Sequence, residues 1–355
     1  MHSKLKSLFV FVIGLIFIVI IFELINGFWF KSELEKNLLQ LNAIYDIDLK
    51  IDPNDYYKNN EKITYRRDSY GLRDDCKNTH KIKMISIGGS TTDQRYIDFP
   101  NTFQKILQNK LRKNNFDICI SNAGVDGHTS LGHKYSIKKW FPLIKGFNPK
   151  YYLLYLGIND AVLINKNKVN KEQNNFLTFL KFKIIENSYL YWFYNKIKNI
   201  LMLNDDRFGI LSHKKDIQKF YKYESNQENT KFKKDLIRNA DQFRVNFAEI
   251  LKIIKKNNSI PICVTQPHRF IKDKKGISKA FKYKDGFLNG IDLNLSLSLI
   301  NNQMKNLCHE NNGFFLDINE IYFDESDFYD FVHLNNKGNK KLANFLYQEL
   351  KSKLN

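Results

Sequence analysis

Apolar residues are distributed along the chain in one long run and several short ones. The long run, Leu8–Phe22, contains fifteen residues without a charged or strongly polar side chain, and apolar character resumes after Glu23 as far as Phe30. As a helix, the segment from Leu8 to Phe30 would extend about 34 Å, against about 30 Å for the hydrocarbon core of a bilayer. The pattern predicts a transmembrane helix. We interpret it as an uncleaved anchor because no small-residue A-x-A site follows it; a signal peptide and a buried core helix are the alternatives.

Five short apolar runs alternate with segments of helical periodicity in the rest of the chain. The predicted strands are 83–87, 116–121, 151–157, 259–265 and 314–318. The predicted helices are 102–113, 130–144, 232–254, 292–311 and 339–350. The run at 151–157, YYLLYLG, is apolar on both faces, which is typical of a buried parallel strand. The alternation predicts a three-layer α/β/α fold with a five-stranded parallel sheet.

The same pattern divides the chain into four parts. They are a cytoplasmic stub at 1–7, a transmembrane anchor at 8–30, a polar connector at 31–81 and one α/β domain at 82–355. Two stretches of the domain do not fit the repeating strand and helix unit: an insertion at about 161–230, rich in aromatic residues and lysines, and a basic loop at 268–290. The aromatic insertion is interpreted as a lid, an interfacial element against a bilayer, or additional core.

The chain is strongly basic, and its charge alone suits an anionic partner. Lysine and arginine number 56 and aspartate and glutamate 37, so the net charge is +19. The lysines are scattered, however, and no zinc-finger, RNP or helix-turn-helix signature organises them. We therefore expect no nucleic-acid partner.

The four cysteines are too few and too widely spaced to indicate a disulfide scaffold, and no CxxC pair suggests a zinc site. Cys119 and Cys263 each lie in an apolar run that is predicted to be a buried strand. Both are expected to be inert thiols in the core.

Polar residues follow four of the predicted elements at the edge where a parallel sheet binds its ligands. The segments are GGST at 88–91, NAGVDGHTS at 122–130, GIND at 157–160 and DFVHLN at 330–335. Singly, each is explained by a turn, a helix cap or a surface pair. Together they supply a hydroxyl, an imidazole, a carboxylate and oxyanion donors at the carboxyl ends of the strands, which are the components of a serine hydrolase.

The predicted roles follow from the chemistry of each group. Ser90 is the nucleophile, His333 the base and Asp330 the carboxylate that orients it, while the N–H groups of Ser90 and Gly127 and the Asn159 amide form the oxyanion hole. An α/β-hydrolase elbow would need glycine two residues after the serine, where Thr92 stands, and no P-loop signature is present. No cofactor or metal ion is expected.

These four blocks, in this order, resemble those of the SGNH hydrolases, also called the GDSL family. The resemblance extends from residue 82 to about 346 and implies a flavodoxin-like fold and the catalytic roles given above. One departure is Gly89, where the eponymous family block has aspartate, and it affects the assignment of a subfamily. The stretch DSYGLRD at 68–74 is similar to a lead-in of membrane-anchored bacterial members.

The expected function is that of a serine esterase which removes a small acyl group, such as acetyl, from a cell-envelope glycan or lipid ester. An acyltransferase with the same acyl-enzyme and a catalytically silent glycan-binding protein are the alternatives. The expected location is the bacterial inner membrane, with the domain at 82–355 outside the cytoplasm. Lys4 and Lys6 before the span, against Lys31 and Lys36 after it, give this orientation only a slight charge bias.

Overall fold

The computed structural model describes most of the chain, and it divides that chain into two compact units. The described residues are 2–40, 47–51, 63–162, 184, 187–191, 193–194, 197, 223–225, 232–274, 277–281 and 289–354. One unit comprises Met1–Gln40 with Asn167–Leu211, and the other comprises Leu41–Lys166 with Ser212–Asn355. We call them, after the roles expected from the sequence, the anchor unit and the catalytic unit.

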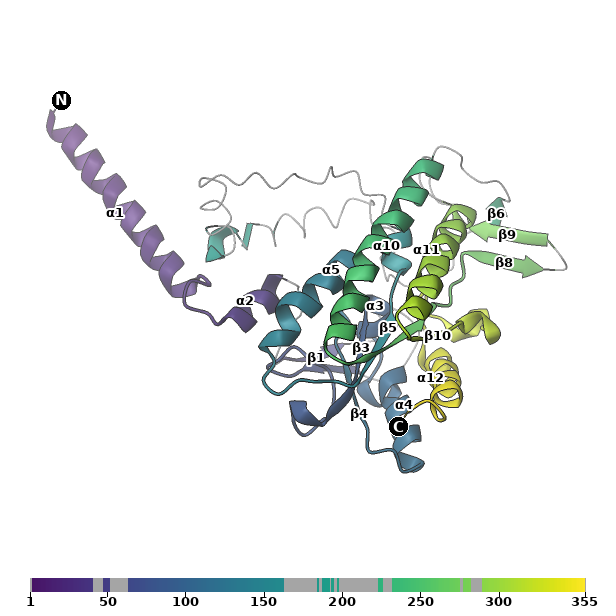
Figure 1. Ribbon diagram of the computed structural model, residues 1–355. Coiled ribbons are helices and arrows are strands. Elements are labelled where there is room, and N and C mark those ends of the chain that lie inside the picture. The colour runs from purple at the N-terminus through teal and green to yellow at the C-terminus, as the bar shows by residue number, and fades with distance from the viewer. Residues whose placement is uncertain are drawn as a thin grey trace. The chain divides into compact units, whose positions relative to one another are not determined.

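A five-stranded parallel sheet forms the centre of the catalytic unit, in the order β10-β7-β5-β3-β4 (Figure 1). The strands are β3 (Ile82–Gly88), β4 (Cys119–Asn122), β5 (Tyr151–Tyr155), β7 (Ile260–Val264) and β10 (Phe314–Leu316). This confirms the predicted α/β fold with five parallel strands. The chain leaves β3 toward β4 and then returns to the other side of β3 as β5. The carboxyl ends of β3 and β5 therefore form the switch point where open α/β sheets bind ligands.

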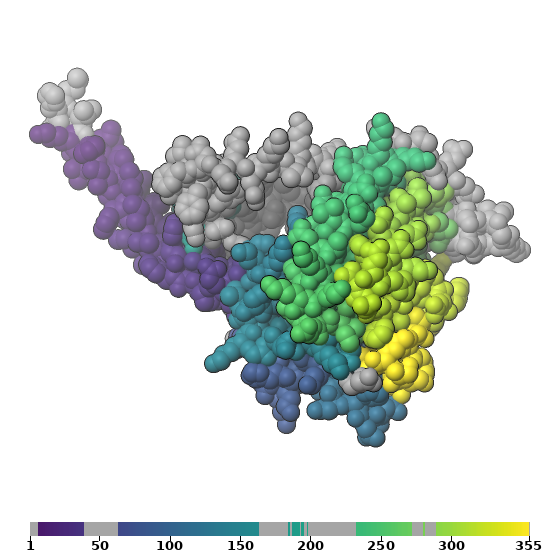
Figure 2. Space-filling view, viewed as in Figure 1, coloured from purple at the N-terminus to yellow at the C-terminus, as the bar shows by residue number. Residues whose placement is uncertain are grey.

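Helices cover both faces of this sheet, because successive strand side chains point to opposite sides. Met84 and Leu153 face a core that they share with α4 (Phe103–Lys113) and α12 (Asn336–Leu350). On the other face lie α5 (Ser130–Tyr135), α10 (Lys233–Lys256) and α11 (Gly290–Glu310). Figure 2 shows α10 and α11 side by side on the surface of the unit.

The expected helix at 130–144 is irregular. After α5 the backbone forms a π-helical turn over Ser136–Trp140 and a 3-10 turn over Phe141–Leu143. Pro142 lacks the N–H that would continue the α-helical hydrogen bonding, which explains the change to a 3-10 turn at the end of the predicted helix.

Part of the predicted connector is built into the catalytic unit. Strands β1 (Ile47–Ile51) and β2 (Ile63–Arg67) pair antiparallel, and a bridge joins Arg73 to Asn122 at the end of β4. Tyr65 and Arg67 are almost completely buried. The alternation of buried and exposed residues along β2 explains why this segment reads as polar in sequence while one of its faces packs against the core.

The basic loop expected at 268–290 also contains regular structure. Strands β8 (Ile271–Lys274) and β9 (Ile277–Phe281) form an antiparallel hairpin, and β6 (Tyr223–Ser225) pairs with β9. The two strands have a short alternation of apolar and charged residues, which is difficult to recognise in sequence because the segment is rich in lysine.

The expectation of free core thiols is wrong, since all four cysteines are paired. Cys76 is bonded to Cys119 and Cys263 to Cys308, and no free cysteine is left. The Cα atoms of the two pairs lie 5.8 and 6.4 Å apart, within the range that a disulfide bridges. The partners are 43 and 45 residues apart in sequence, so only the folded arrangement brings them together.

The anchor unit contains helices α1 (His2–Asn26) and α2 (Glu33–Gln40) and several helical residues between 184 and 197. Within α1, the 21 residues Lys6–Asn26 are long and apolar enough to cross a membrane, and none of them is buried in protein. Length and composition would equally suit a signal sequence. Most of the predicted insertion at 161–230 lies outside the described residues.

Candidate active site

Ser90 is positioned by a tight turn at the carboxyl end of β3. It is the first residue of the short helix α3 (Ser90–Asp93), whose Thr92 and Asp93 N–H groups donate to the carbonyl of Gly89. A Cβ atom at Gly88 would collide with the backbone carbonyl of Tyr155 on β5. Glycine is therefore required there, and the close approach of the two strands presents Ser90 at the switch point of the sheet.

His333 and Asp330 lie against Ser90 and complete a chain of hydrogen bonds. The Nε2 atom of His333 is 2.7 Å from the Oγ atom of Ser90, and its Nδ1 atom is 2.5 Å from Oδ2 of Asp330. The other Asp330 oxygen accepts the N–H groups of Val332 and His333 at 2.9 and 2.7 Å. These bonds fix both the carboxylate and the ring, so the predicted nucleophile, base and orienting acid are brought together over 243 residues of sequence.

The charge state of His333 is set by two opposing effects. Burial of the ring favours the neutral imidazole, but the negative charge of Asp330 and its hydrogen bond favour the imidazolium. The second effect prevails, so the pKa of His333 is raised above its usual 6.5. A raised pKa makes the ring a stronger base toward the Ser90 hydroxyl.

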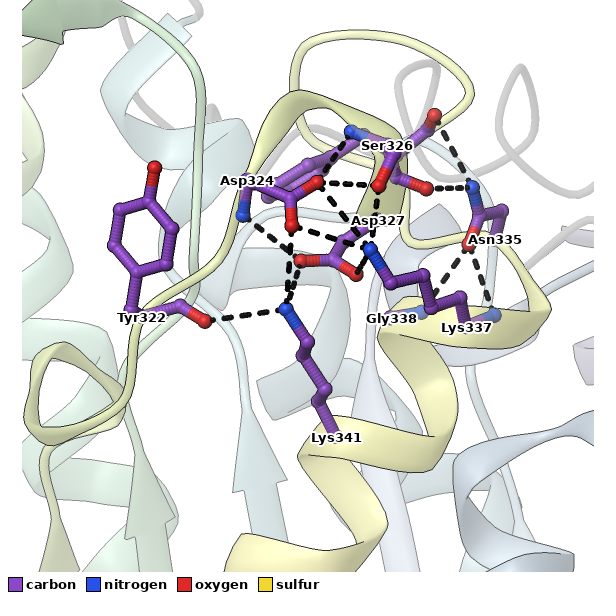
Figure 3. Close-up of polar contacts among 9 residues, drawn as sticks. Tyr322, Asp324, Ser326, Asp327, Asn335, Lys337, Gly338 and Lys341 are labelled. Carbon is purple, nitrogen blue, oxygen red and sulfur yellow. Dashed lines mark hydrogen bonds and ion pairs between the residues drawn. The ribbon is translucent and has the colours of Figure 1, made fainter.

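An ionic network joins the segment that precedes the Asp330 and His333 loop to the helix that follows it (Figure 3). Lys341 of α12 contacts the Asp327 carboxylate at 2.5 Å, and Lys337 contacts Asp324 at 3.1 Å. At the other end of the loop, the Asn335 backbone N–H donates to the Asp327 carbonyl at 2.9 Å. The base of the loop is thus tied to the first turns of α12, which holds Asp330 and His333 in place.

Asn159 lies beside the nucleophile turn, on α6 (Ile158–Val162) after β5. A Cβ atom placed on Gly89 would be only 2.5 Å from the Asn159 Nδ2 atom. The absence of a side chain at 89 therefore makes room for this amide, which gives the departure from the GDSL block a physical reason. In this state the amide donates to the His128 carbonyl at 2.8 Å.

Gly127 lies in the loop after β4, next to His128, and adopts a φ of +74° that favours glycine. The pKa of the neighbouring Asp126 carboxyl is raised, chiefly because the group is withdrawn from water. The Asn159 amide is thus bonded to the loop that carries Gly127 through the His128 carbonyl.

Two buried polar groups, which the sequence analysis did not identify, hold the residues around Ser90 in position. The first is Gln266, directly beyond β7, whose amide N–H₂ donates to the Thr91 hydroxyl at 2.6 Å. Its carbonyl accepts the N–H of Ile158 at 2.9 Å. One side chain therefore joins the turn that carries Ser90 to the helix that carries Asn159.

The second missed group is Arg67, which lies beneath the nucleophile turn. Its guanidinium donates to the Asp93 carboxylate at 2.7 Å and to the Gly71 carbonyl at 2.6 Å, and it also bonds the Gly124 carbonyl. The Tyr65 hydroxyl donates to the same Asp93 oxygen at 2.6 Å. Asp93 is the last residue of the helix that begins at Ser90, so this network stabilises the short helix that carries Ser90.

Within the described part of the chain, no group of three histidine, cysteine, aspartate or glutamate residues is arranged so that it could hold a metal ion. The chemistry of the site is that of its hydroxyl, imidazole, carboxylate and amide groups.

Residues 84–346 match the family model described as GDSL-like lipase/acylhydrolase. The chain belongs to this family. The match runs from within β3 to within α12 and includes the turn that carries Ser90 and the loop that carries Asp330 and His333. The GDSL family consists of esterases and other hydrolases, so the protein is an enzyme of this class.

Several solved structures are similar to the chain at low sequence identity. TesA is 11% identical, with a TM-score of 0.43, and the match covers 76% of this chain and 98% of that chain. A putative lipolytic protein of the G-D-S-L family from Desulfitobacterium hafniense is 13% identical, with a TM-score of 0.41 and coverages of 77% and 100%. Axe2, an acetylxylan esterase from Geobacillus stearothermophilus, is 14% identical, with a TM-score of 0.43 and coverages of 76% and 94%. No curated protein sequence matches the chain.

Proposed function

We propose that the protein is a serine esterase that acts through an acyl-enzyme formed on Ser90. The observation that carries the proposal is the continuous chain from the Ser90 hydroxyl through His333 to Asp330, with contacts of 2.7 and 2.5 Å. A binding protein on the same fold has no need of this alignment. Membership of the GDSL family gives the same reaction class.

In the first step His333 takes the proton of Ser90 while Oγ attacks the ester carbonyl. The imidazolium that forms is stabilised by Asp330 and then protonates the departing alcohol, which leaves the acyl group on Ser90. Water attacks the acyl-enzyme, with His333 again as the base, and free acid is released. An acceptor hydroxyl in place of water would complete an acyl transfer by the same steps.

The negative charge that develops on the carbonyl oxygen is assigned to three donors: the N–H groups of Ser90 and Gly127 and the amide of Asn159. The Asn159 amide exchanges its present acceptor, the His128 carbonyl, for the oxyanion. Such donors often tighten onto the reacting atoms only in the substrate complex.

The proposed substrate is a small acyl ester, such as acetyl, on a cell-envelope glycan or lipid. This choice follows from location, because α1 is long and apolar enough to hold the enzyme at a membrane. The two disulfides support an oxidising compartment for the catalytic unit, since disulfides persist outside the cytoplasm and are rare within it. We therefore place the catalytic unit on the extracytoplasmic side.

Hydrolysis of p-nitrophenyl acetate by the purified full chain tests the nucleophile. Ser90→Ala should leave only the background rate, whereas Ser298→Ala, which changes an exposed serine on α11, should keep the parent rate. Equal rates for Ser90→Ala and the parent would reject the assignment. Release of free acetate from an acetylated glycan would support hydrolysis, and acceptor-dependent formation of a new ester would support transfer.

A further inference from the structure

A short segment of the anchor unit carries four exposed apolar side chains on residues with helical backbone conformation. They are spaced i, i+3, i+4 and i+7, which is the spacing of residues on one face of a helix. They are Leu190, Phe193, Tyr194 and Ile197, with exposed fractions of 43%, 45%, 59% and 40%. Contiguous exposed apolar surface of this kind marks a site of protein or membrane contact.

The start of this segment is bonded to α1 through the carboxylate of Glu23. That carboxylate accepts the Ser188 hydroxyl at 2.7 Å and the backbone N–H groups of Tyr189 and Leu190 at 2.9 Å each. The Ser188 Oγ atom in turn accepts the Tyr191 N–H at 3.1 Å. Glu23 and Ser188 thus satisfy the free N–H groups at the beginning of the segment.

Further contacts fix the same junction. The Phe28 N–H donates to the Asn187 carbonyl at 2.8 Å, and the rings of Phe22 and Tyr189 meet edge to face at 5.8 Å. A Cβ atom on Gly27 would lie 2.8 Å from the Asn187 carbonyl oxygen, so glycine permits this approach. The segment is therefore held at the last turn of α1 by side chains and backbone together.

The level of this junction in a membrane follows from the length of α1. The 21 residues Lys6–Asn26, most of them apolar, extend about 31 Å, which matches a hydrocarbon core of about 30 Å. Glu23 and Asn26 then lie at the headgroup boundary. Just beyond them Trp29 and Phe30 are 36% and 82% exposed, and tryptophan is characteristic of membrane interfaces.

We propose that the stripe formed by Leu190, Phe193, Tyr194 and Ile197 inserts into the interfacial layer of the bilayer that receives the end of α1. The inference rests on the membrane anchor proposed above. The partner of the stripe is the lipid surface, because Glu23 holds the stripe at the depth where α1 leaves the hydrocarbon. Tyrosine is favoured at this depth, since its ring can lie in lipid while its hydroxyl stays in water. The enzyme then has a second membrane contact beside its single span.

Nitroxide labels on the full chain test this contact in vesicles of phosphatidylcholine and phosphatidylglycerol. All four native cysteines are in disulfides, so a single introduced cysteine carries the label. The test position is Tyr194→Cys, with Ile197→Cys as a second position on the stripe. Ile16→Cys in α1 reports the hydrocarbon, and Ile237→Cys, 47% exposed on α10, is the matched control in the catalytic unit. Collision with oxygen reports lipid, and collision with a nickel chelate reports water.

The expected ratio of oxygen to nickel collisions at Tyr194 and Ile197 lies between the high ratio at Ile16 and the low ratio at Ile237. A low ratio at the stripe with a high ratio at Ile16 overturns this inference and leaves the anchor intact. A label at Tyr194 that neither reagent reaches means that protein covers the stripe, which also overturns it. A low ratio at Ile16 overturns the anchor and the inference together, while esterase activity is judged separately.

Glu23→Ala tests the part that the carboxylate plays. Removal of its oxygens should raise nickel access at Tyr194 while the ratio at Ile16 stays unchanged. An unchanged ratio at Tyr194 would overturn the role of Glu23 in setting the depth of the stripe.

Discussion

Replacement of Arg67 by methionine should destabilise the catalytic unit strongly, although the residue lies outside the catalytic chain. The guanidinium and the Asp93 carboxylate form a buried pair with exposed fractions of 2% and 1%. Methionine keeps much of the packing volume but removes the closest cation from the carboxylate, which keeps the Tyr65 hydroxyl at 2.6 Å and the Arg95 guanidinium at 3.8 Å. Removing one partner of a buried pair costs about 3 to 5 kcal/mol because the other charge stays buried with less compensation.

The assay is thermal unfolding of purified protein together with the rate of p-nitrophenyl acetate hydrolysis. For a unit of this size, 1 kcal/mol corresponds to about 2 to 4 °C, so Arg67→Met should lower Tm by roughly 6 to 20 °C. Activity measured well below the new Tm should also fall, because Asp93 ends the helix that begins at Ser90. The matched control is Arg66→Met on the same strand, whose side chain is exposed.

A Tm for Arg67→Met within a degree or two of that for Arg66→Met would refute the reasoning. The double variant Arg67→Met with Asp93→Leu gives a second test. It should recover part of the lost stability, since it also removes the buried carboxylate that has lost its closest cationic partner. Failure to recover any stability would show that the packing of Arg67, rather than its charge, holds the nucleophile turn.

Further predictions concern the site and the disulfides. Asn159→Ala should lower kcat about 100- to 1,000-fold in steady-state assays, and an unchanged kcat would remove Asn159 from the oxyanion hole. The base must be neutral to act, so kcat/KM should rise with pH through a pKa above 6.5. Asp330→Asn should move that midpoint to lower pH because the charge that raises the pKa of His333 is gone. The joint change of Cys263 and Cys308 to serine should cost about 2 to 5 kcal/mol in urea unfolding, and no loss would mean that the bond does not form.

The sheet and the meeting of Ser90, His333 and Asp330 were predictable because both follow from local sequence patterns. Each strand is a short apolar run, and residues at the carboxyl ends of parallel strands meet at one edge of the sheet. Ser90, His333 and Asp330 therefore converge although their sequence separation is large. The nucleophile turn added a detail that the pattern did not contain, namely the need for an absent side chain at Gly89 beside Asn159.

The cysteine pairs and the Arg67 network were not predictable because neither leaves a periodic signal. Cys76 and Cys119 become neighbours only when the segment before β3 packs against β4. Arg67 alternates with exposed residues on a polar strand, and its partner Asp93 is 26 residues away. Such contacts depend on the three-dimensional packing of segments that look unrelated in sequence.

Covalent labelling of the purified full chain by a fluorophosphonate tests the central claim most directly, with the modified peptide identified by mass spectrometry. The reagent reacts with a serine hydroxyl that an adjacent base activates, and His333 lies 2.7 Å from the Ser90 hydroxyl. We expect one label, on Ser90, which is lost in His333→Ala. A chain that stays unlabelled, or that carries its label on another serine, would contradict the account.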